Sequence, residues 1–237
     1  TLNEELKQGW MQVIAPPEIV LNCSNITNQN FTNQKLLCIS GYKLDECSKA
    51  GIEDWLITLN NSSYTTSNLT GSDGKYEFCN LVPGRYTLTE ETKDGYISSG
   101  PISLDVTLPC GSNLTDRNFT NQALLCISGH KMNTCGQFNL SNWTIVLTNS
   151  LGGAMSALTN ETGYYQFCGL PPGIYNLSEE SKEGWSLVSA PQQVTLNCSN
   201  TSGMDFVNSE CCGSSLKINK TADFGPSPAN PAGVNQA

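Results

Sequence analysis

Short stretches of alternating apolar and polar residues, rather than helical periodicity, characterise most of the chain. Residues 55–59, 76–78 and 86–89 are rich in β-branched and aromatic side chains, and Asp-Gly or Pro-Gly turn signals separate such stretches. No segment has the spacing of an amphipathic helix. Several short strands at close spacing predict small antiparallel β-sandwiches, an all-β fold without significant helix.

The strand pattern is repeated along the chain. The sequence ISGYK at residues 39–43 returns as ISGHK at 127–131, and YEFCNLVPGRYTLTEE at 76–91 returns as YQFCGLPPGIYNLSEE at 165–180. We therefore predict two complete tandem domains with a partial one at each end. These are residues 1–34, the C-terminal half of a preceding domain; 35–122, the first repeat; 123–210, the second repeat; and 211–237, the opening strand and proline-rich tail of a further domain.

Alternation also predicts which polar residues face the core. Residues two apart on a strand share a face, and Lys43, Glu90 and Asn121 each share a face with large apolar neighbours. These three side chains are therefore predicted to be buried. The equivalent residues of the second repeat are Lys131, Glu179 and Asn208. Buried charges are costly unless they are paired, which marks both sets as candidate sites.

The order of these segments resembles the collagen-adhesin B-type (Cna B-type, SdrD B-like) domains of bacterial and archaeal surface proteins. The resemblance is carried by ISGYK, a tryptophan-containing strand, SDGKYEFCNLVPGRYTLTEETKDGY and a closing NFTN. Its most specific part is the pattern G-x-Y-x-F-x-x-L-x-x-G-x-Y-x-L-x-E. It covers both complete repeats and the N-terminal half, and it implies a transthyretin-like β-sandwich that serves as a stalk or pilus module.

Many domains of that family contain a self-formed isopeptide bond, in which a lysine of the first strand attacks an asparagine of the last while a buried glutamate shuttles protons. The resemblance implies these roles, in that order, for Lys43, Asn121 and Glu90, and for Lys131, Asn208 and Glu179. Burial favours the neutral amine, which is the nucleophile. The alternative is an ion pair without a cross-link, or a lysine that reaches solvent.

Three neighbouring residues bear on this expectation. Asp45 fits the family pattern, whereas Asn133 replaces it in the second repeat. Asn118 is a competing acceptor, but alternation points it outward and it begins a glycosylation sequon.

Eleven cysteines without a CxxC motif indicate an oxidising compartment and disulfides rather than a metal site. The favoured pairs are Cys47–Cys79 and Cys135–Cys168 within domains, and Cys23–Cys38, Cys110–Cys126 and Cys198–Cys212 between them, with Cys211 left over. The alternative pairs are Cys38–Cys110 and Cys126–Cys198. The sequence leaves both arrangements open.

Asn-x-Ser/Thr sequons are frequent and lie mostly outside the apolar stretches, which indicates a glycosylated exterior with covalent glycans. They begin at Asn22, Asn25, Asn30, Asn60, Asn61, Asn68, Asn113, Asn118, Asn139, Asn142, Asn160, Asn176, Asn197, Asn200 and Asn219.

The formal net charge of −9, without a basic cluster, disfavours binding to nucleic acid or to an anionic membrane. No apolar stretch approaches the ~18 residues that span a bilayer. No cofactor motif is present. The acidic residues Asp45, Glu46, Glu53 and Asp54 lack the spacing of a calcium loop and are interpreted as a solvated loop.

These features predict a non-enzymatic structural protein: a segment or subunit of a secreted, N-glycosylated, cross-linked filament, sheath or stalk on a microbial cell surface, with an archaeal cell as one expected source. The alternative is an adhesin whose repeats bind a ligand. The N-terminal half-domain has Glu4 and Asn33 but lacks the counterpart of Lys43, and the C-terminal segment offers Lys220. The predicted partners are therefore further copies of the chain, head to tail, or additional repeats of a longer array.

Overall fold

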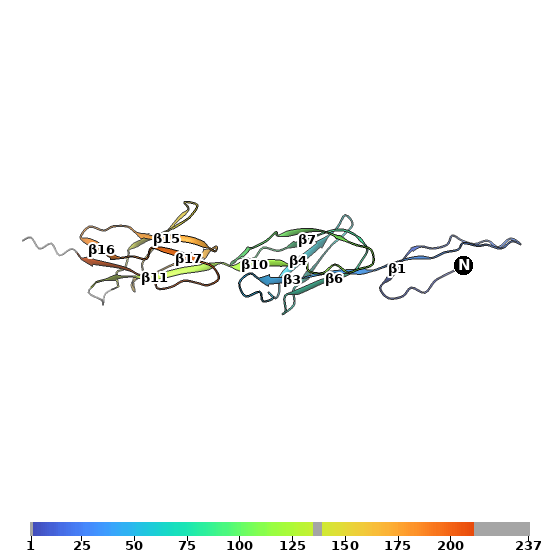
Figure 1. Ribbon diagram of the computed structural model, residues 1–237, viewed down its shortest axis with the longest axis horizontal. Helices are drawn as coiled ribbons and strands as arrows, with labels where there is room; N and C mark the ends of the chain where they lie inside the picture. The colour runs from blue at the N-terminus through green and yellow to red at the C-terminus, as the bar shows by residue number, and fades with distance from the viewer. Residues whose placement is uncertain (1, 135–138, 211–237) are drawn as a thin grey trace, which may run out of the picture.

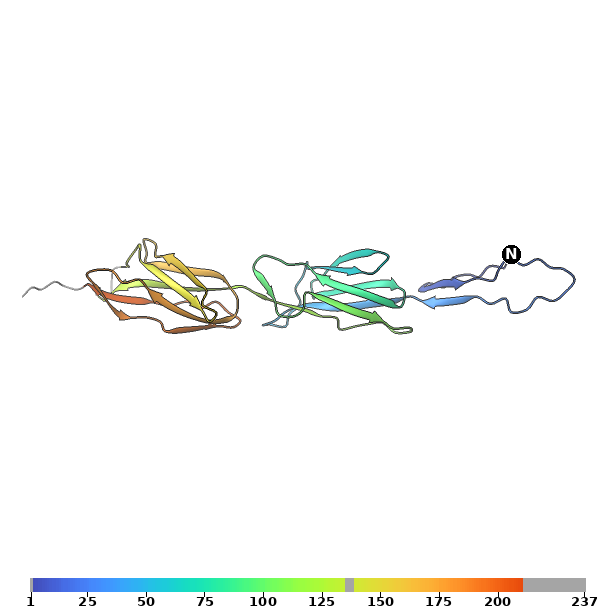
Figure 2. The same cartoon turned by 90° about the horizontal axis from the view of Figure 1, so that it is seen from above.

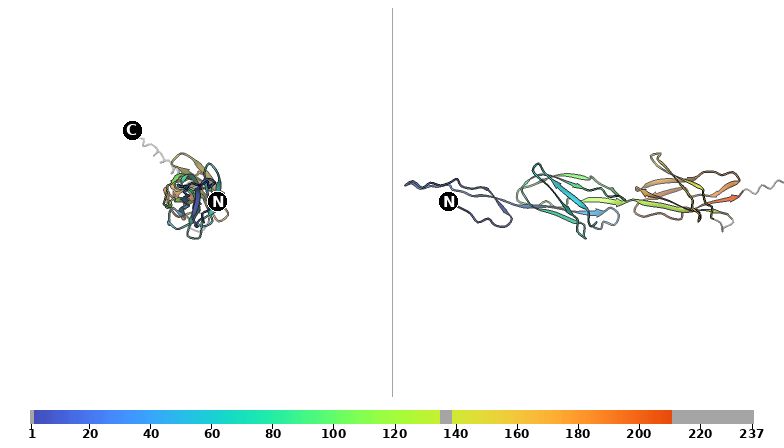
Figure 3. Two further views of the ribbon diagram at one scale, coloured as in Figure 1. Left: turned by 90° about the vertical axis from the view of Figure 1, so that its right-hand side faces the viewer. Right: turned by 180° about the vertical axis from the view of Figure 1, so that it is seen from behind.

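Every regular element in the part of the chain that the structure describes, residues 2–134 and 139–210, is a β-strand. The computed structural model contains two complete β-sandwiches and an N-terminal hairpin, which follow one another along one long axis (Figure 1). The view along that axis shows them stacked within a narrow cross-section (Figure 3). The predicted all-β fold of tandem small sandwiches is confirmed.

The first sandwich contains two four-stranded sheets. The sheet that carries Lys43, called the lysine sheet, has the spatial order β6 (Lys75–Leu81), β3 (Leu37–Asp45), β10 (Phe119–Ala123) and β8 (Tyr96–Ser98). The sheet that carries Glu90, called the glutamate sheet, has the order β5 (Thr65–Leu69), β4 (Leu56–Asn60), β7 (Gly84–Glu90) and β9 (Ser103–Leu108).

The second sandwich repeats this arrangement, so its lysine sheet carries Lys131 and its glutamate sheet carries Glu179. The lysine sheet has the order β14 (Tyr164–Leu170), β11 (Leu125–Asn133), β18 (Phe206–Glu210) and β16 (Trp185–Ser189). The glutamate sheet has the order β13 (Ala154–Leu158), β12 (Thr144–Asn149), β15 (Gly173–Glu179) and β17 (Gln193–Leu196).

The two lysine sheets each contain one parallel pair of strands within an otherwise antiparallel arrangement. Strand β10 runs parallel to β3, and Phe119 lies opposite Lys43. The chain reaches β10 from the other sheet, so it can enter beside β3 in the same direction. Asn121 lies one inward-facing position beyond Phe119, which makes Lys43 and Asn121 diagonal neighbours on adjacent strands.

Alternating apolar side chains from both sheets meet between them and form one core per sandwich. In the first sandwich, Ile39 and Phe119 of the lysine sheet pack with Ile57 and Leu88 of the glutamate sheet, and all four are buried. Burial of each such side chain contributes about 1.5–3 kcal/mol. This core holds the two sheets in register and so fixes the polar residues that lie within it.

The glycine in each ISG motif is required by the close approach of a neighbouring backbone. A Cβ atom at Gly41 would lie 2.1 Å from the carbonyl oxygen of Arg117, and one at Gly129 would lie 2.0 Å from that of Met204. These distances are far inside van der Waals contact. The segment that leads into the last strand can therefore lie against the first strand only because these positions are glycine.

The N-terminal hairpin, β1 (Trp10–Ile14) and β2 (Thr32–Lys35), corresponds to β8 and β10 of a complete sandwich. Trp10 pairs with Lys35 at the start of the hairpin, as Tyr96 pairs with Ala123 in the first sandwich. Among the described residues, no strand pairs with the other edge of β2, where β3 lies against β10.

Consecutive parts of the structure are joined by single residues. Leu36 separates β2 from β3, and Leu124 separates β10 from β11; Figure 2 shows the chain passing directly from one part to the next. At the junction of the sandwiches, the buried side chain of Gln122 donates a hydrogen bond to the backbone carbonyl of Asn197. A connection this short restricts the relative motion of the two sandwiches.

The three disulfides among the described residues are Cys38–Cys79, Cys126–Cys168 and Cys47–Cys198. The first two join neighbouring strands of the lysine sheets, and Cys38 and Cys126 each lie where the strand register shifts at an irregularity. The third links the turn after β3 of the first sandwich to the residues after β17 of the second. Its Cα atoms are 5.5 Å apart, a usual disulfide separation.

The predicted cysteine pairing is wrong. Each of the favoured pairs Cys47–Cys79, Cys135–Cys168, Cys23–Cys38, Cys110–Cys126 and Cys198–Cys212 contains a cysteine that is bonded elsewhere, and so does each alternative pair, Cys38–Cys110 and Cys126–Cys198. Cys23 and Cys110 are exposed and free. Cys135, Cys211 and Cys212 lie outside the described residues. The prediction joined consecutive domains through the cysteines nearest to their linkers. It failed because the sequence does not reveal how β3 pairs with β6.

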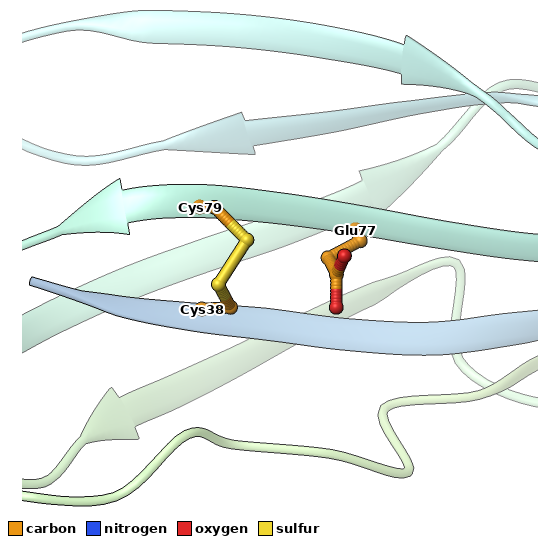
Figure 4. A group of neighbouring side chains, drawn as sticks. All are labelled: Cys38, Glu77 and Cys79. Carbon is orange, nitrogen blue, oxygen red and sulfur yellow. A yellow bond between two sulfur atoms is a disulfide. The ribbon is translucent and has the colours of Figure 1, made fainter. Parts of the chain in front are cut away.

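Figure 4 shows Glu77 beside the Cys38–Cys79 disulfide, on the same strand as Cys79. The three side chains are close enough to suggest a metal-binding group. However, thiolates are the sulfur ligands that metals bind, and both sulfurs here are held in a disulfide. The oxidised group therefore lacks the ligands for a thiolate metal site.

Removal of the disulfide between the sandwiches is expected to loosen their alignment without unfolding either one. Replacing both Cys47 and Cys198 by serine should leave the melting temperatures nearly unchanged, because each sandwich has its own core. Small-angle scattering should show a wider range of interdomain angles. As the matched comparison, replacing Cys38 and Cys79 by serine should destabilise the first sandwich by about 3–4 kcal/mol. Equal melting losses in both variants would contradict this assignment.

Candidate cross-linking site

Each complete sandwich buries a lysine, a glutamate and an asparagine between its two sheets. In the first, Lys43 and Asn121 come from β3 and β10 of the lysine sheet, and Glu90 comes from the end of β7 in the glutamate sheet. Lys43 is fully buried, and Glu90 and Asn121 are each 3% exposed. The burial predicted from alternation is confirmed for these three residues; the cross-link itself stays a prediction.

In the first sandwich, the carboxylate of Glu90 contacts two groups. Its Oε2 atom accepts a short hydrogen bond from the Lys43 ammonium, and its Oε1 atom accepts one of 3.1 Å from the Ser98 hydroxyl. The Oδ1 atom of Asn121 is buried without a hydrogen-bond partner. Both oxygens of the Glu90 carboxylate thus accept hydrogen bonds, while the side-chain carbonyl of Asn121 accepts none.

In the second sandwich, the glutamate contacts both the lysine and the asparagine. Lys131 Nζ lies 2.8 Å from Glu179 Oε2, and Asn208 Nδ2 donates a 2.7 Å hydrogen bond to Glu179 Oε1. Lys131 is fully buried, Asn208 is 2% exposed, and the Glu179 side chain is 6% exposed. The Oδ1 atom of Asn208 has no partner. One carboxylate therefore joins the two groups that the predicted reaction would connect.

A tryptophan covers each buried lysine. Lys43 Nζ lies 4.4 Å from the ring centre of Trp55, and Lys131 Nζ lies 4.7 Å from that of Trp143. The ring faces attract a cation and at the same time exclude water. The tryptophans thus form part of the apolar surroundings of the two lysine side chains.

Burial controls the protonation of both lysines. Removal from water lowers the pKa of Lys43 and of Lys131 below the usual lysine range, and the hydrogen bonds and charges of Glu90 and Glu179 offset only part of this effect. A lowered amine pKa increases the fraction of neutral, nucleophilic lysine. Two buried tyrosines nearby, Tyr76 and Tyr165, have pKa values raised by burial, so they stay neutral.

The competing acceptor is directed away from the site. Asn118 is exposed, and its Oδ1 atom accepts a 2.9 Å hydrogen bond from the backbone N–H of Tyr42. Asp45 lies opposite Asn121 on the neighbouring strand, but its carboxylate accepts hydrogen bonds from Cys47 and Ser48. These bonds lower the pKa of Asp45. The Asp45 carboxylate thus holds the turn that carries Cys47.

Sequence reasoning missed Ser98, Trp55 and Trp143 as parts of the site. Strand alternation places an inward residue of β8 beside Asn121, and Ser98 pairs with it; in the second sandwich that position is Leu187. Trp55 and Trp143 occupy equivalent positions in the two repeats. This equivalence indicated that they pack in the core, but not that they contact a lysine.

The other predicted sites lie on the surface. Every sequon asparagine within the described residues is exposed except Asn61, which is half-buried; Asn219 lies outside them. Glu46, Glu53 and Asp54 are not part of a cation-binding group among the described residues. Residues 2–134 and 139–210 contain no helix long and apolar enough to cross a membrane.

The chain belongs to the SpaA family of prealbumin-like fold domains, whose family model matches residues 38–121 and 126–210. This confirms the resemblance to transthyretin-like repeat domains. The chain is also 24% identical over 236 residues to serine-aspartate repeat-containing protein F of Staphylococcus epidermidis, an alignment that covers 85% of this chain and 14% of that protein. The chain thus spans a small part of the length of this relative.

The comparison with solved structures finds similarity to three further proteins, among others. The Bacillus anthracis TIE protein is 18% identical, with a TM-score of 0.39 over 78% of this chain and 36% of that one. A streptococcal ancillary pilin is 16% identical, with a TM-score of 0.38 over 86% of this chain and 76% of that one. The shaft pilin SpaA of Lactobacillus rhamnosus GG is 12% identical, with a TM-score of 0.35 over 74% of this chain and 98% of that one. Their TM-scores are below 0.5, so the family assignment stands on the family model alone.

The lowered lysine pKa values predict a pH dependence that a cross-link would remove. If Lys43 has not reacted, its amine has a lowered pKa in the folded chain and a pKa of about 10.4 in the unfolded chain. Between these two pKa values the unfolded chain binds more protons than the folded one. The free energy of unfolding should therefore rise with pH in that window. Denaturant unfolding of Asn121→Ala between about pH 8 and 9.5 should show this slope, below the range where tyrosines titrate. Asn118→Ala keeps Asn121, so Lys43 can still form the amide and should add nothing to the pH dependence of its stability. Equal slopes would contradict the assignment.

Proposed function

We propose that the chain is a load-bearing segment of an extracellular stalk or filament, built from sandwiches in series that are locked by internal cross-links. The observation that carries this proposal is the buried Lys–Glu–Asn group in each sandwich, combined with a one-residue linker and a disulfide at their junction. Disulfides persist in oxidising surroundings, which agrees with an extracellular location.

The cross-link that fits each group is an amide between lysine and asparagine. The neutral Nζ atom of Lys43 attacks Cγ of Asn121, a new C–N bond forms, and the bond to Nδ2 breaks. Glu90 accepts a proton from Nζ and delivers it to the leaving nitrogen, so ammonia is released and the carboxyl group ends unchanged. Lys131, Asn208 and Glu179 take the same roles. No oxidant or cofactor is needed.

Two contacts in the second sandwich support this proposal: Glu179 lies against both Lys131 and Asn208. Rotation of the Asn208 amide by 180° exchanges Nδ2 and Oδ1, and a protonated Glu179 would then donate its hydrogen bond to the carbonyl oxygen. This polarises the carbon that the lysine attacks. In the first sandwich, the Ser98 hydroxyl holds the same carboxylate oxygen, and a turn of that hydroxyl would release it.

The position of the cross-link suits a protein under tension. The bond would join the first strand of each sandwich to the last, and those strands carry the chain into and out of it. A pulling force would then pass through the amide instead of unzipping the sheets. The glycan coat predicted from the exposed sequons would add protection from proteases, and we take residues 2–34 as part of a further sandwich in the same series.

Electron microscopy with antibodies against this chain, on cells that make it, tests the proposed function. We expect labelling of projections or of a sheath outside the cell, and loss of those structures when the coding segment is deleted. Labelling confined to soluble secreted material would contradict the proposal. Unchanged projections together with lost attachment to a surface would favour an adhesin instead.

A further inference from the structure

Strand β13 lies at the edge of the glutamate sheet in the second sandwich. It pairs with β12 on one side, and among the described residues no strand pairs with its other side. The strand is exposed along most of its length: Met155 is 49% exposed and Leu158 is 63% exposed. A free strand edge is a template for pairing with another chain unless something blocks it.

The two ends of the β12–β13 hairpin show which backbone groups face the free edge. At one end the backbone N–H of Asn149 donates to the carbonyl of Gly153, and at the other end the N–H of Thr159 donates to the carbonyl of Trp143. The register between these ends is unbroken, so every second residue of β13 directs its N–H and C=O toward β12. The residues whose N–H and C=O point away from the sheet are Ala154, Ser156 and Leu158.

The sequence of β13, AMSAL, is complementary to itself when two copies run antiparallel about Ser156. Each Leu158 then lies opposite the other copy's Ala154. Each Met155 likewise lies opposite the other copy's Ala157. Large side chains thus meet small ones, and the outward N–H and C=O groups of both strands find partners. The same surface serves on both copies, which is the arrangement of a two-fold dimer.

The segment around β13 carries almost no charge. Residues 140–178 contain a single charged residue, Glu161, although the chain has a formal net charge of −9. Copies of an acidic chain repel one another. Like-charge repulsion is weakest where both copies present this uncharged segment, which favours a second copy of this chain as the occupant of the edge.

The equivalent edge of the first sandwich, β5, is protected. Asn68 of β5 stands where β13 has Ala157; it begins a predicted sequon, and its side chain donates a 3.2 Å hydrogen bond to the backbone carbonyl of Glu77 on β6. Glu77 also forms a 3.5 Å ion pair with Lys75, and both charged residues are replaced by uncharged ones in β14. Charges and bulky groups are the usual protection of strand edges. They occur at β5 and are missing at β13.

We propose that β13 is a docking edge for β13 of a second copy of this chain, with the two strands antiparallel and centred on Ser156. The pairing joins the two glutamate sheets through backbone hydrogen bonds. One strand pair buries little surface and binds weakly by itself. Copies repeated along a filament make many such contacts at once, which strengthens the association. The contact thus gives stalks of this protein a means of lying side by side.

This consequence for stalks rests on the proposed function, but the pairing itself does not, because it needs neither the internal amides nor a filament. A measurement that counts chains in solution can therefore fail without affecting the proposed function. Loss of the projections from cells would equally leave the pairing in solution untouched.

Sedimentation of the purified chain, with its exposed thiols alkylated, tests the pairing. The chain should pass from monomer to dimer as its concentration rises from about 1 μM to about 1 mM. Ser156→Pro should weaken the dimer at least about tenfold, because it removes one hydrogen-bond donor from each copy at the centre of the pair. The monomer should tolerate this change, since the lost N–H points away from β12 and proline is accepted at such edge positions.

Ser67→Pro is the matched control. Ser67 is the equivalent residue of β5, and the unbroken register of β4 with β5 directs its N–H toward the free edge as well. This variant should dimerise like the unchanged chain. A chain that stays monomeric up to about 1 mM, or equal weakening by the two variants, would overturn the proposal.

A disulfide trap decides the case if the proline variants fail to fold. Ser156→Cys places two thiols opposite each other across the two-fold axis, with Cα atoms about 5.5 Å apart, a usual disulfide separation. In a glutathione redox buffer, non-reduced peptide mapping should show position 156 linked to position 156 of a second copy. Ser67→Cys should give no comparable link between copies. Absence of the 156–156 link, or an equal yield at position 67, would refute the inference.

Discussion

Asn121→Ala should lower the melting temperature of the first sandwich by about 20 °C. The substitution removes the acceptor of the proposed amide but keeps the Lys43–Glu90 ion pair, so no unpaired charge is left behind. A cross-link from Lys43 to Asn121 closes most of the sandwich into one loop, which stabilises it by about 4 kcal/mol through the entropy of the unfolded chain. For a domain of this size, each kcal/mol corresponds to about 4–8 °C.

The control for this substitution is Asn118→Ala. Asn118 is the same residue type and lies three positions earlier; its substitution removes an exposed hydrogen bond to Tyr42 and a predicted sequon. In deglycosylated protein the change should therefore be about 1 kcal/mol or less. Scanning calorimetry of both variants under non-reducing conditions measures the difference. Similar melting temperatures for the two variants would show that Asn121 has no covalent role.

Gly41→Ala should destabilise the first sandwich by about 3 kcal/mol or more. The new methyl group would overlap the carbonyl oxygen of Arg117, which belongs to the backbone and cannot rotate away as a side chain could. Strand β3 would have to separate from the segment that leads into β10. Because that movement also shifts Asn121 away from Lys43, the variant should form less of the cross-link.

Gly100→Ala is the matched control in the same sandwich. A Cβ at Gly100 meets no atom within 4 Å, and its φ is not in the left-handed region. Its free energy of unfolding should change by less than about 0.5 kcal/mol. Denaturant unfolding compares the two variants, and equal effects would refute the steric explanation of the ISG motif.

Much of the fold was predictable because β-strands impose a simple period on the sequence. Repeated segments fixed the two sandwiches, and alternation placed Lys43, Glu90 and Asn121 in the core without knowledge of how the strands pair. The pairing of β10 with β3 was harder to predict. The two strands are parallel and distant in the chain, so no turn signal in the sequence marks them as neighbours.

The disulfides could not be predicted because they depend on register and on the junction of the sandwiches. Cys38 reaches Cys79 at the irregularity where the register of β3 against β6 shifts, which the sequence does not reveal. Cys47 meets Cys198 because β3 ends at the junction, a fact about how two sandwiches stack. The same limit applies to Ser98, whose place beside Asn121 depends on the pairing of β8 with β10.

The repeats themselves explain which predictions transfer between sandwiches. The two ion pairs, the two covering tryptophans and the two intra-sheet disulfides occur in equivalent places. The contact between asparagine and glutamate occurs in the second sandwich and in the N-terminal hairpin, but in the first sandwich Ser98 takes that carboxylate oxygen. The second sandwich should therefore form its amide at least as readily as the first.

The intact mass of the chain after reduction and deglycosylation tests the central claim most directly. Each amide between lysine and asparagine releases one ammonia, so the mass should be lower than the sequence mass by about 17 Da per bond, about 34 Da for both sandwiches. Asn121→Ala should abolish one of these two deficits and Asn118→Ala neither. A mass equal to that of the sequence would contradict the internal cross-links.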